Sequence, residues 1–355
     1  MTISEQITRI KNAKAAIKQA IQNKGVTVSD TAKLDEYPAL IDSITAGSGE
    51  SYERPDFYEL RTKGGTDYRG LFCYAYTKPG EDVIISDFDS SRVTDMSYMF
   101  SYAGNSAGEI IGLHSLDFSS VRNMAFMFYM CSAGGNINLS GISFPEAKDT
   151  NRMFANNYYI KAIDVSNVDM PKVTDAGYMF AVGSSSLVTS INLTGINMPS
   201  ITTAENMFNY CAKVTSLDVS GINFSKVTNI NALFYNCKLL VDITGEIDLS
   251  SVSSGLYSSA SYNPFRYCYA LETLYLKNIY KDVTTMKNEA KWSLNLSETK
   301  VKDECLIYII NELPDLINDK GLTATDKIVL TLPPTNTLTQ EQKQVARDKG
   351  WQVVN

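Results

Sequence analysis

The hydrophobic pattern of the chain is set by one phenylalanine that returns after every 26 to 31 residues. Methionine precedes the first five of these phenylalanines, and a small or aliphatic residue lies seven positions before each of the first six. A period of this length is typical of solenoids, in which short units stack and bury a shared core. We therefore expect one core column formed by the anchors Phe100, Phe128, Phe154, Phe180, Phe208, Phe234 and Phe265.

The segment that leads to each anchor has the apolar spacing of a helix. In the unit VTDMSYMF, Val93, Met96, Met99 and Phe100 stand at positions i, i+3, i+6 and i+7. Threonine or aspartate near the start of the segment is suited to cap the first free backbone N–H groups. We therefore predict a short helix or helical turn in each unit.

Two short stretches of alternating residues separate these segments. The first has apolar residues at Ile111/Leu113, Ile137/Leu139, Ile163/Val165, Ile191/Leu193 and Leu217/Val219. The second follows five residues later, at Leu116/Phe118, Ile142/Phe144, Val168/Met170, Ile196/Met198 and Ile222/Phe224. Alternation with period two predicts short strands, so each unit is expected to run through strand, bend, helical turn and return.

Residues 3–23 predict one amphipathic helix with an isoleucine seam. The seam consists of Ile3, Ile7, Ile10, Ile17 and Ile21, and Gly25 follows as a stop signal. Isoleucine at both seam positions of a heptad favours three or four strands, so we expect a homotrimer, with a dimer left open. The alternative is a helical hairpin, in which the isoleucines pack on a second short helix through Leu34, Tyr37, Leu40, Ile41 and Ile44.

Composition divides the chain into five parts. Residues 1–46 form the helical anchor or oligomerisation module, and the small, polar residues 47–51 form a linker. Residues 52–82 are expected to cap a solenoid over 83–276, and 277–355 to form a repeat remnant with an α/β cap. Within that cap, the pattern predicts helices over 301–318 and 339–350 and strands over 326–332 and 351–355.

The units resemble the BspA-like leucine-rich repeats of bacterial surface proteins. The resemblance covers about 83–276 and is clearest in SRVTDMSYMFSYAG and SKVTNINALFYNC. It implies an α+β repeat solenoid of right-handed coils, with a ladder of short parallel strands and a set of helical turns. It also implies an adhesion scaffold for varied partners, and it implies no particular ligand, because similarity of fold does not transfer a site.

Residues 1–46 resemble the short helical modules of virion structural proteins in tailed phages of gut bacteria. The matching positions are Ile10, Ala13, Lys14, Ile17, Ala20, Ile21, Lys24, Gly25 and Val26. In those proteins the module leads into varied C-terminal domains. The resemblance implies attachment to other virion proteins of the capsid or the tail, as in a head fibre or tail fibre.

Charge and composition narrow the class of protein. Of the 355 residues, 44% are hydrophobic and 20% charged, and the net charge is -7. The stretch 47–276 holds 15 basic and 23 acidic residues, a balance that disfavours nucleic acid as a partner. The first residues lack the apolar run of a signal peptide, and no stretch has the length and apolarity of a membrane span. We therefore expect assembly in a host cytoplasm, localisation in the virion and no membrane insertion.

Few residue types that support catalysis are present. His114 is the single histidine, which excludes most Ser-His-Asp catalysis and every multi-histidine metal site. Cys131, Cys211, Cys237 and Cys268 each follow an anchor by three residues, so we predict a column of reduced, buried thiols. We expect no enzyme activity, no cofactor and no metal centre.

Two surface features remain as candidate binding sites. The polar residues inside the predicted strands should point outward and stack. They form a ladder that binds calcium or sugar hydroxyls, or, as the alternative, a solvated face without a ligand. These residues are Asp117, Asn138, Asp164, Asp169, Asn192 and Asp218. Tyrosines around the predicted helical turns form either a partner face or aromatic filler. They include Tyr98, Tyr102, Tyr129, Tyr158, Tyr159, Tyr178, Tyr210 and Tyr235.

These features together predict a non-enzymatic structural protein of a tailed-phage virion. It would be a head fibre or a tail-associated decoration or receptor-binding protein, whose solenoid contacts a protein or glycan on the host surface. The alternative is a bacterial cell-surface leucine-rich-repeat adhesin.

Overall fold

The computed structural model divides the chain into two compact units, Met1–Lys63 and Gly64–Asn355. It describes residues 66–73, 82–85, 89–104, 108–254, 256, 263–279, 293–318 and 328–355, together with Lys14, Ala15, Lys18 and Ser29. Lys14, Ala15 and Lys18 are helical. The seam residues Ile3, Ile7, Ile10, Ile17 and Ile21 and the second predicted helix lie outside the described residues, so the anchor module stays a prediction.

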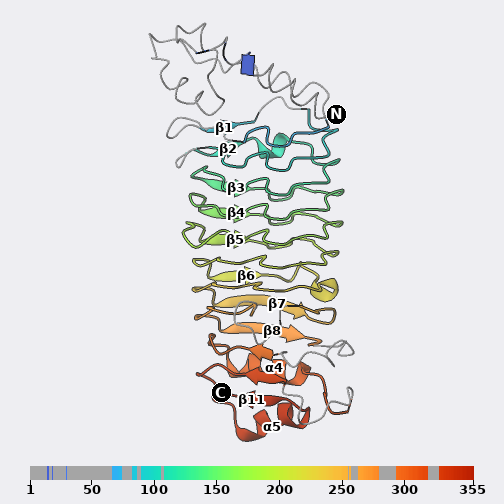
Figure 1. Ribbon diagram of the computed structural model, residues 1–355, viewed down its shortest axis with the longest axis vertical. Coiled ribbons are helices and arrows are strands. Elements are labelled where there is room, and N and C mark those ends of the chain that lie inside the picture. The colour runs from blue at the N-terminus through green and yellow to red at the C-terminus, as the bar shows by residue number, and fades with distance from the viewer. Residues whose placement is uncertain are drawn as a thin grey trace. The chain divides into compact units, whose positions relative to one another are not determined.

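The second unit is a parallel β-solenoid (Figure 1). Its strands are β1 (Val83–Ile84), β2 (Ile110–Ile111), β3 (Asn136–Asn138), β4 (Ala162–Asp164), β5 (Ser190–Asn192), β6 (Ser216–Asp218), β7 (Asp242–Asp248) and β8 (Thr273–Lys277). They form the parallel sheets β1-β2, β3-β4-β5 and β6-β7-β8. The register joins Ile137 to Ile163 and Ile163 to Ile191, so buried residues of successive coils lie over one another. The stacked, parallel short strands predicted from the repeat are therefore present.

The anchor phenylalanines form one continuous stack through the core. Their ring centroids lie 5.2 to 6.0 Å apart and their planes agree within 13°. The six anchors from Phe100 to Phe234 have no exposed surface. The stack also includes Phe72, so residues 66–73 of the predicted cap already follow the repeat.

The helical turns predicted before each anchor are wrong. Met96, Tyr98 and Phe100 donate their N–H groups to carbonyls of the next coil, at 2.9, 3.1 and 2.8 Å. The N–H groups of Met99 and Ser101 each donate to the carbonyl three residues earlier, which closes two successive tight turns. Tight turns bury every third or fourth residue, as a helix does, and the apolar spacing alone does not separate the two. The fold is a β-solenoid with few helices.

These turns require left-handed backbone at two places in most coils, two residues before and two residues after the anchor. The residues before the anchor are Tyr98, Phe126, Arg152, Tyr178, Asn206 and Ala232, with φ between 52° and 59°. Those after the anchor include Tyr102, Met130, Asn156, Tyr210, Asn236 and Tyr267. This conformation costs an L-residue about 1–2 kcal/mol. The hydrogen bonds between coils hold the backbone in place against that cost.

The strand register differs from the prediction in the first full coil. Ile110 is buried and Ile111 is 45% exposed, although Ile111 was the predicted inward residue. Gly112, with φ 97°, bends the chain directly after β2, and the carbonyl oxygen of Ile85 lies 2.2 Å from where a Cβ would stand. The second predicted stretches contribute single parallel bridges, such as Ser143 with Asp169, rather than strands. Short 3-10 helices η2 (Leu113–Ser115) and η3 (Phe224–Lys226) complete two of the coils.

The C-terminal part contains helices and strands within the four predicted ranges, and β9, which was not predicted. They are β9 (Ser293–Asn295), α4 (Asp303–Glu312), β10 (Val329–Thr331), α5 (Gln340–Asp348) and β11 (Gln352–Val354), with a parallel sheet in the order β11-β10-β9. Helix α4 is shorter than the predicted 301–318 because Leu313 is extended before Pro314. Thr339 and Gln342 form a capping box at the start of α5.

Candidate functional site

The predicted exposed ladder lies on the surface and serves the turns that follow the strands. We call Asp117, Asn138, Asp164, Asn192 and Asp218 the strand ladder; the last four end strands β3 to β6, and Asp117 follows the 3-10 helix η2. Each side-chain oxygen accepts a hydrogen bond from the backbone N–H two residues later, at 2.8 to 3.2 Å. Asp169 instead accepts a hydrogen bond from Asn197 Nδ2 at 2.7 Å. These bonds give each residue a structural role, while the predicted role in binding calcium or sugar stays a prediction.

Hydrogen bonds also hold two of the strand-ladder carboxylates, Asp117 and Asp164, in the charged form. The Ser119 hydroxyl and N–H lower the pKa of Asp117. Burial works to raise the pKa of Asp164, but hydrogen bonds from Ser166 and Asn192 outweigh it and the pKa is lowered. Across the described ranges, no three Asp, Glu, His or Cys residues gather as ligands for a metal ion.

A second polar ladder, which sequence reasoning read only as helix caps, runs along the turns. Its members, which we call the turn ladder, stand five residues before the first seven stacked phenylalanines, from Phe72 to Phe234, and are Asp67, Asp95, Asn123, Asp149, Asp175, Thr203 and Asn229. Parallel bridges join all seven in succession. A small polar residue at one fixed distance from the anchor is a signal that the sequence already contained.

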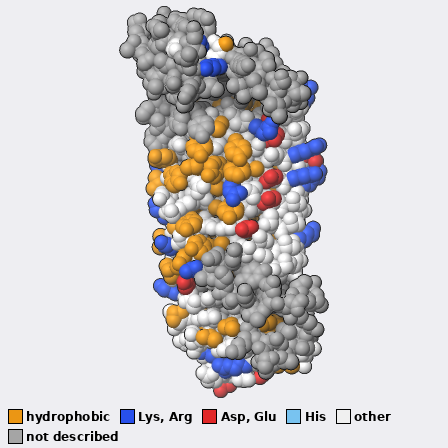
Figure 2. Space-filling model, in the orientation of Figure 1, with side chains coloured by type: hydrophobic (Ala, Val, Ile, Leu, Met, Phe, Trp, Pro, Cys, Tyr) orange, Lys and Arg blue, Asp and Glu red, His pale blue; other side chains and the backbone are white. Residues whose placement is uncertain are grey.

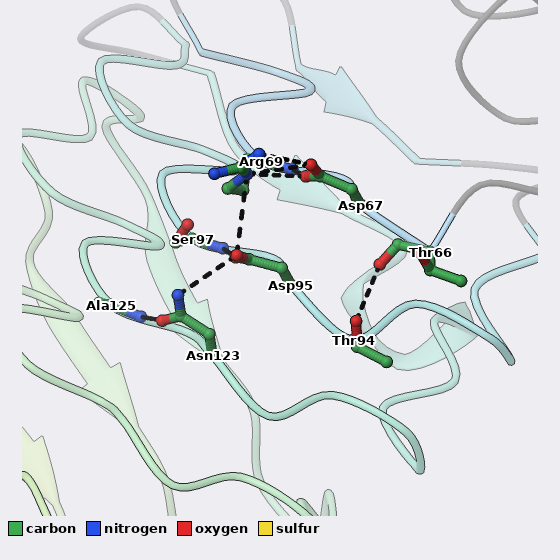
Figure 3. A network of polar contacts seen from close by, with 8 residues as sticks. All are labelled: Thr66, Asp67, Arg69, Thr94, Asp95, Ser97, Asn123 and Ala125. Atoms are coloured by element: carbon green, nitrogen blue, oxygen red, sulfur yellow. Dashed lines mark hydrogen bonds and ion pairs between the residues drawn. The ribbon is translucent and has the colours of Figure 1, made fainter. Parts of the chain in front are cut away.

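Figure 3 shows the first rungs of the turn ladder. Asp95 accepts hydrogen bonds from the Ser97 N–H at 2.9 Å and from Asn123 Nδ2 at 3.4 Å. The Arg69 guanidinium forms a bidentate ion pair with the Asp67 carboxylate, and its Nε lies 3.7 Å from Oδ2 of Asp95. Further along, Asp149 forms no ion pair with any described lysine or arginine. Burial raises the pKa of Asp149, and the nearby Asp175 and Asp95 raise it further.

The predicted cysteine column is confirmed as buried and free of disulfides. Cys131, Cys211, Cys237 and Cys268 have at most 1% exposed surface. Each thiol donates to a carbonyl of the preceding coil, at 3.0 to 3.4 Å. Burial raises the pKa of Cys131 and Cys268 to about 12. A thiol with this pKa is neutral at physiological pH, so the column contributes packing rather than a nucleophile.

Aromatic side chains gather on the outer side of the turns, and we call this surface the aromatic edge. Its upper set is Tyr98, Tyr102, Phe126, Tyr129, Arg152 and Tyr178. The Tyr98 and Phe126 rings stack at 4.6 Å, and Tyr129 contacts both Phe126 and Tyr102. The Arg152 guanidinium lies between two rings, 5.6 Å from Phe126 and 4.1 Å from Tyr178. Tyr98 is 43% exposed, so this set is partly open to solvent.

The lower set of the aromatic edge repeats the arrangement further along the solenoid. It consists of Tyr210, Tyr235, Arg266 and Tyr267. Tyr235 contacts Tyr210 at 5.7 Å and Tyr267 at 5.3 Å, and the Arg266 guanidinium lies 4.6 Å over the Tyr267 ring. Burial and the neighbouring Tyr210 and Tyr267 raise the pKa of Tyr235, so its hydroxyl stays protonated at neutral pH. In Figure 2, hydrophobic side chains gather over the coils between β2 and β8, with acidic ones beside them.

The other predicted features take ordinary positions. His114 is exposed and its Nε2 lies 3.1 Å from the Ser140 carbonyl oxygen. Tyr158 and Tyr159 are exposed but lie four and five residues after an anchor, outside the aromatic edge. Within the described residues, no helix has the length and apolarity needed to cross a membrane.

Comparison with known proteins gives a family and no function. A family model described as "Mycoplasma protein of unknown function, DUF285" matches residues 56–163 and 148–263. No curated protein and no solved structure matches the chain. The family match and the stacked parallel coils agree with the BspA-like repeat solenoid expected from the repeats. Since the two matches together span more than half of the 355 residues, the chain is a member of the DUF285 family.

Proposed function

We propose that the chain is a non-enzymatic binding protein of a tailed-phage virion, either a head fibre or a tail-associated decoration or receptor-binding protein. The observation that carries the binding role is the aromatic edge, which presents tyrosine, phenylalanine and arginine on consecutive coils. These residue types are the ones that dominate binding energy at interfaces. The partner in this proposal is a protein or glycan on the host surface.

The solenoid is a suitable support for such a surface. Phenylalanine stacking and hydrogen bonds between coils fix the backbone at every aromatic-edge residue, including Tyr98 and Tyr178. Side chains on a rigid support lose little further conformational freedom on binding. The aromatic edge is therefore preorganised.

The virion role rests on the resemblance of residues 1–46 to helical modules of phage structural proteins. In this proposal the isoleucine seam forms a homotrimer that joins capsid or tail proteins. Aspartate at two seam positions should disrupt the seam, because a charge in an apolar helix interface is strongly unfavourable.

Immunogold electron microscopy of phage particles tests this proposal. Particles are produced with the unaltered chain, with Ile10→Asp/Ile17→Asp, or with Tyr178→Ala as a control that leaves the seam intact. We expect label on particles with the unaltered chain and the control, and none with the seam variant. Light scattering of the purified proteins should give the mass of a trimer for the unaltered chain and for Tyr178→Ala. It should give the mass of a single chain for the seam variant. Particles that carry no label with any chain would contradict the virion role.

A bacterial cell-surface adhesin is the second candidate. It is favoured by the family description, which names Mycoplasma. Cell fractionation separates the candidates, because an adhesin would be found on the surface of bacteria that contain no phage particles.

A further inference from the structure

We propose that a second edge of the solenoid lies on the surface of an anionic lipid membrane. This edge, which we call the return edge, is formed by the segments that lead from an anchor phenylalanine to the next strand. It comprises residues 156–161, 182–189, 211–215, 237–241 and 268–272. The inference goes beyond the role proposed above, because it concerns a separate surface and a lipid partner. Three observations carry it: the alignment of exposed apolar side chains, the local charge, and the residue types.

The return segments repeat one pattern of burial from coil to coil. Two positions before strands β4 to β8, a buried aliphatic residue faces the core, and these residues are Ile160, Val188, Val214, Leu240 and Leu271. The residue before each of them is exposed or half-buried, and these are Tyr159, Leu187, Lys213, Leu239 and Ala270. Backbone hydrogen bonds keep neighbouring segments in register, such as Thr189 N–H to the Lys161 carbonyl at 2.9 Å. The outer side chains therefore follow one another at the spacing of strands, about 4.8 Å.

Large apolar side chains of the return edge are open to solvent. Tyr159 and Leu187 are each 44% exposed, Leu239 is 52% exposed and Tyr269 is 49% exposed. Apolar residues exposed singly are ordinary on a protein surface. These four instead belong to four of the five consecutive coils that contain β4 to β8 (Figure 1). A row of this kind indicates an interaction surface.

The charge of the return edge is opposite to that of the solenoid as a whole. The stretch 47–276 holds 23 acidic and 15 basic residues. The first four return segments contain Lys161, Lys213 and Lys238 and no aspartate or glutamate. All three lysines are exposed, and none forms an ion pair with any described carboxylate. This positive charge, which no neighbour compensates, attracts an anionic partner.

The residue types favour a lipid surface over a protein. Protein interfaces are depleted in lysine, and leucine is rare among the residues that dominate their binding energy. At membrane interfaces, tyrosine lies at the level of the headgroups, leucine enters the acyl boundary, and lysine reaches anionic headgroups from an apolar stem. The return edge combines these three types. Consecutive coils present them in one row, which suits a flat surface.

Vesicle flotation of the full chain tests the inference. The vesicles consist of phosphatidylcholine alone, or of phosphatidylcholine and phosphatidylglycerol in equal amounts. The charge variant is Lys213→Gln/Lys238→Gln. Its matched control is Lys148→Gln/Lys226→Gln, which removes two exposed lysines outside the return edge and changes the net charge equally.

A second pair of variants tests the apolar side chains. The apolar variant is Leu187→Ser/Leu239→Ser. Its matched control is Ile84→Ser/Ile111→Ser, which removes two exposed residues, 61% and 45% exposed, from β1 and β2. Circular dichroism checks that each variant is folded.

We expect the unaltered chain and both controls to float with the anionic vesicles and not with phosphatidylcholine alone. The charge variant should bind about thirtyfold more weakly, because each lysine near an anionic leaflet contributes roughly a fivefold factor. The apolar variant should bind about tenfold more weakly, because two leucines no longer leave water. In 1 M salt, where the Debye length is about 3 Å, binding should weaken as well.

Flotation with neither kind of vesicle would overturn the inference, and so would equal binding by the edge variants and their controls. Affinity electrophoresis in gels with poly-L-glutamate tests an acidic protein as the partner. Retardation in these gels without flotation would assign the return edge to a protein and overturn the lipid inference. Particle labelling tests the virion role separately, so either proposal can fail without the other.

Discussion

The interior and the surface of the same coils follow different rules. Inside, phenylalanine fills the anchor position in eight stacked coils, from Phe72 to Phe265. Two residues earlier, the side chain changes from Tyr98, Phe126, Arg152 and Tyr178, which reach the surface, to Asn206 and Ala232, which are buried. An interior ring must match its neighbours above and below at close packing, while a surface side chain has solvent on one side. The interior therefore specifies the scaffold, and the surface is free to carry binding specificity.

Replacing one interior ring and one surface ring of the same coil should separate these roles most clearly. Phe180→Ala removes a fully buried ring from the middle of the stack and should lower the free energy of unfolding by roughly 3–5 kcal/mol. Tyr178→Ala, two residues away on the aromatic edge, should cost less than about 1 kcal/mol. Urea unfolding followed by circular dichroism measures both. Equal effects would show that the stack and the edge contribute alike to stability.

Thiol labelling tests the interior of the coils by a different measurement. Burial raises the pKa of Cys131 and Cys268 to about 12, so at pH 8 these thiols should resist alkylation in the native protein. Cys73 is only half-buried and should react first. In denaturant all six cysteines should react at once. Mass spectrometry of partly labelled protein locates the reacted residues, and early modification of Cys131 or Cys268 would contradict the register of the repeat.

On the surface, the strand ladder should contribute a moderate amount of stability. Asp164→Ala removes the oxygen that accepts from the Ser166 N–H at 2.9 Å and should cost about 1 kcal/mol at pH 7. The pKa of Asp164 is lowered in the folded protein, so this stability is present above the unfolded pKa and is lost as pH falls through the folded pKa. Asp164→Asn keeps the acceptor and serves as the control. A cost of Asp164→Ala that does not change between pH 7 and pH 2 would argue against the carboxylate as the source.

The repeat made the interior predictable and left much of the surface undetermined. The anchors and the cysteine column follow from the repeat, because the same packing recurs in each coil. Tight turns and helices both bury residues at spacings of three and four, so the apolar pattern does not distinguish them. The outward position of Ile111 is not predictable from the pattern, because the bend at Gly112 depends on the close approach of Ile85, a contact between segments that are distant in sequence. The strand ladder had a readable signal, since Asn138 and Asp164 are each followed two residues later by serine, a pattern typical of side-chain-capped turns. The Oδ1 of Asn236, which accepts no hydrogen bond from any described residue, had no such signal, because its surroundings depend on which side chains the neighbouring coils bring close.

The smallest expected effect is a gain in stability, opposite to the losses expected above, and it concerns Asp149 in the turn ladder. Asp149→Asn should raise the free energy of unfolding by about 0.5 kcal/mol at pH 7, the usual size of a surface substitution. The amide can keep the turn, because Asn123 and Asn229 accept the same backbone hydrogen bond in their coils at 3.0 and 2.9 Å. It also removes a charge close to Asp95 and Asp175, whose repulsion adds to burial in raising the pKa of Asp149.

The dependence on pH identifies that cause. A carboxyl group whose pKa is raised in the folded state lowers stability as pH rises through its titration range, so the advantage of Asp149→Asn should be full at pH 7 and should vanish at a pH below the unfolded pKa. Asp164→Ala changes in the same pH range but as a loss, because the pKa of Asp164 is shifted the other way. Thermal unfolding of both variants between pH 2 and pH 7 measures the two curves together. A lower stability of Asp149→Asn at pH 7 would show that the carboxylate makes a favourable contact, and the repulsion among the turn-ladder carboxylates would then be absent.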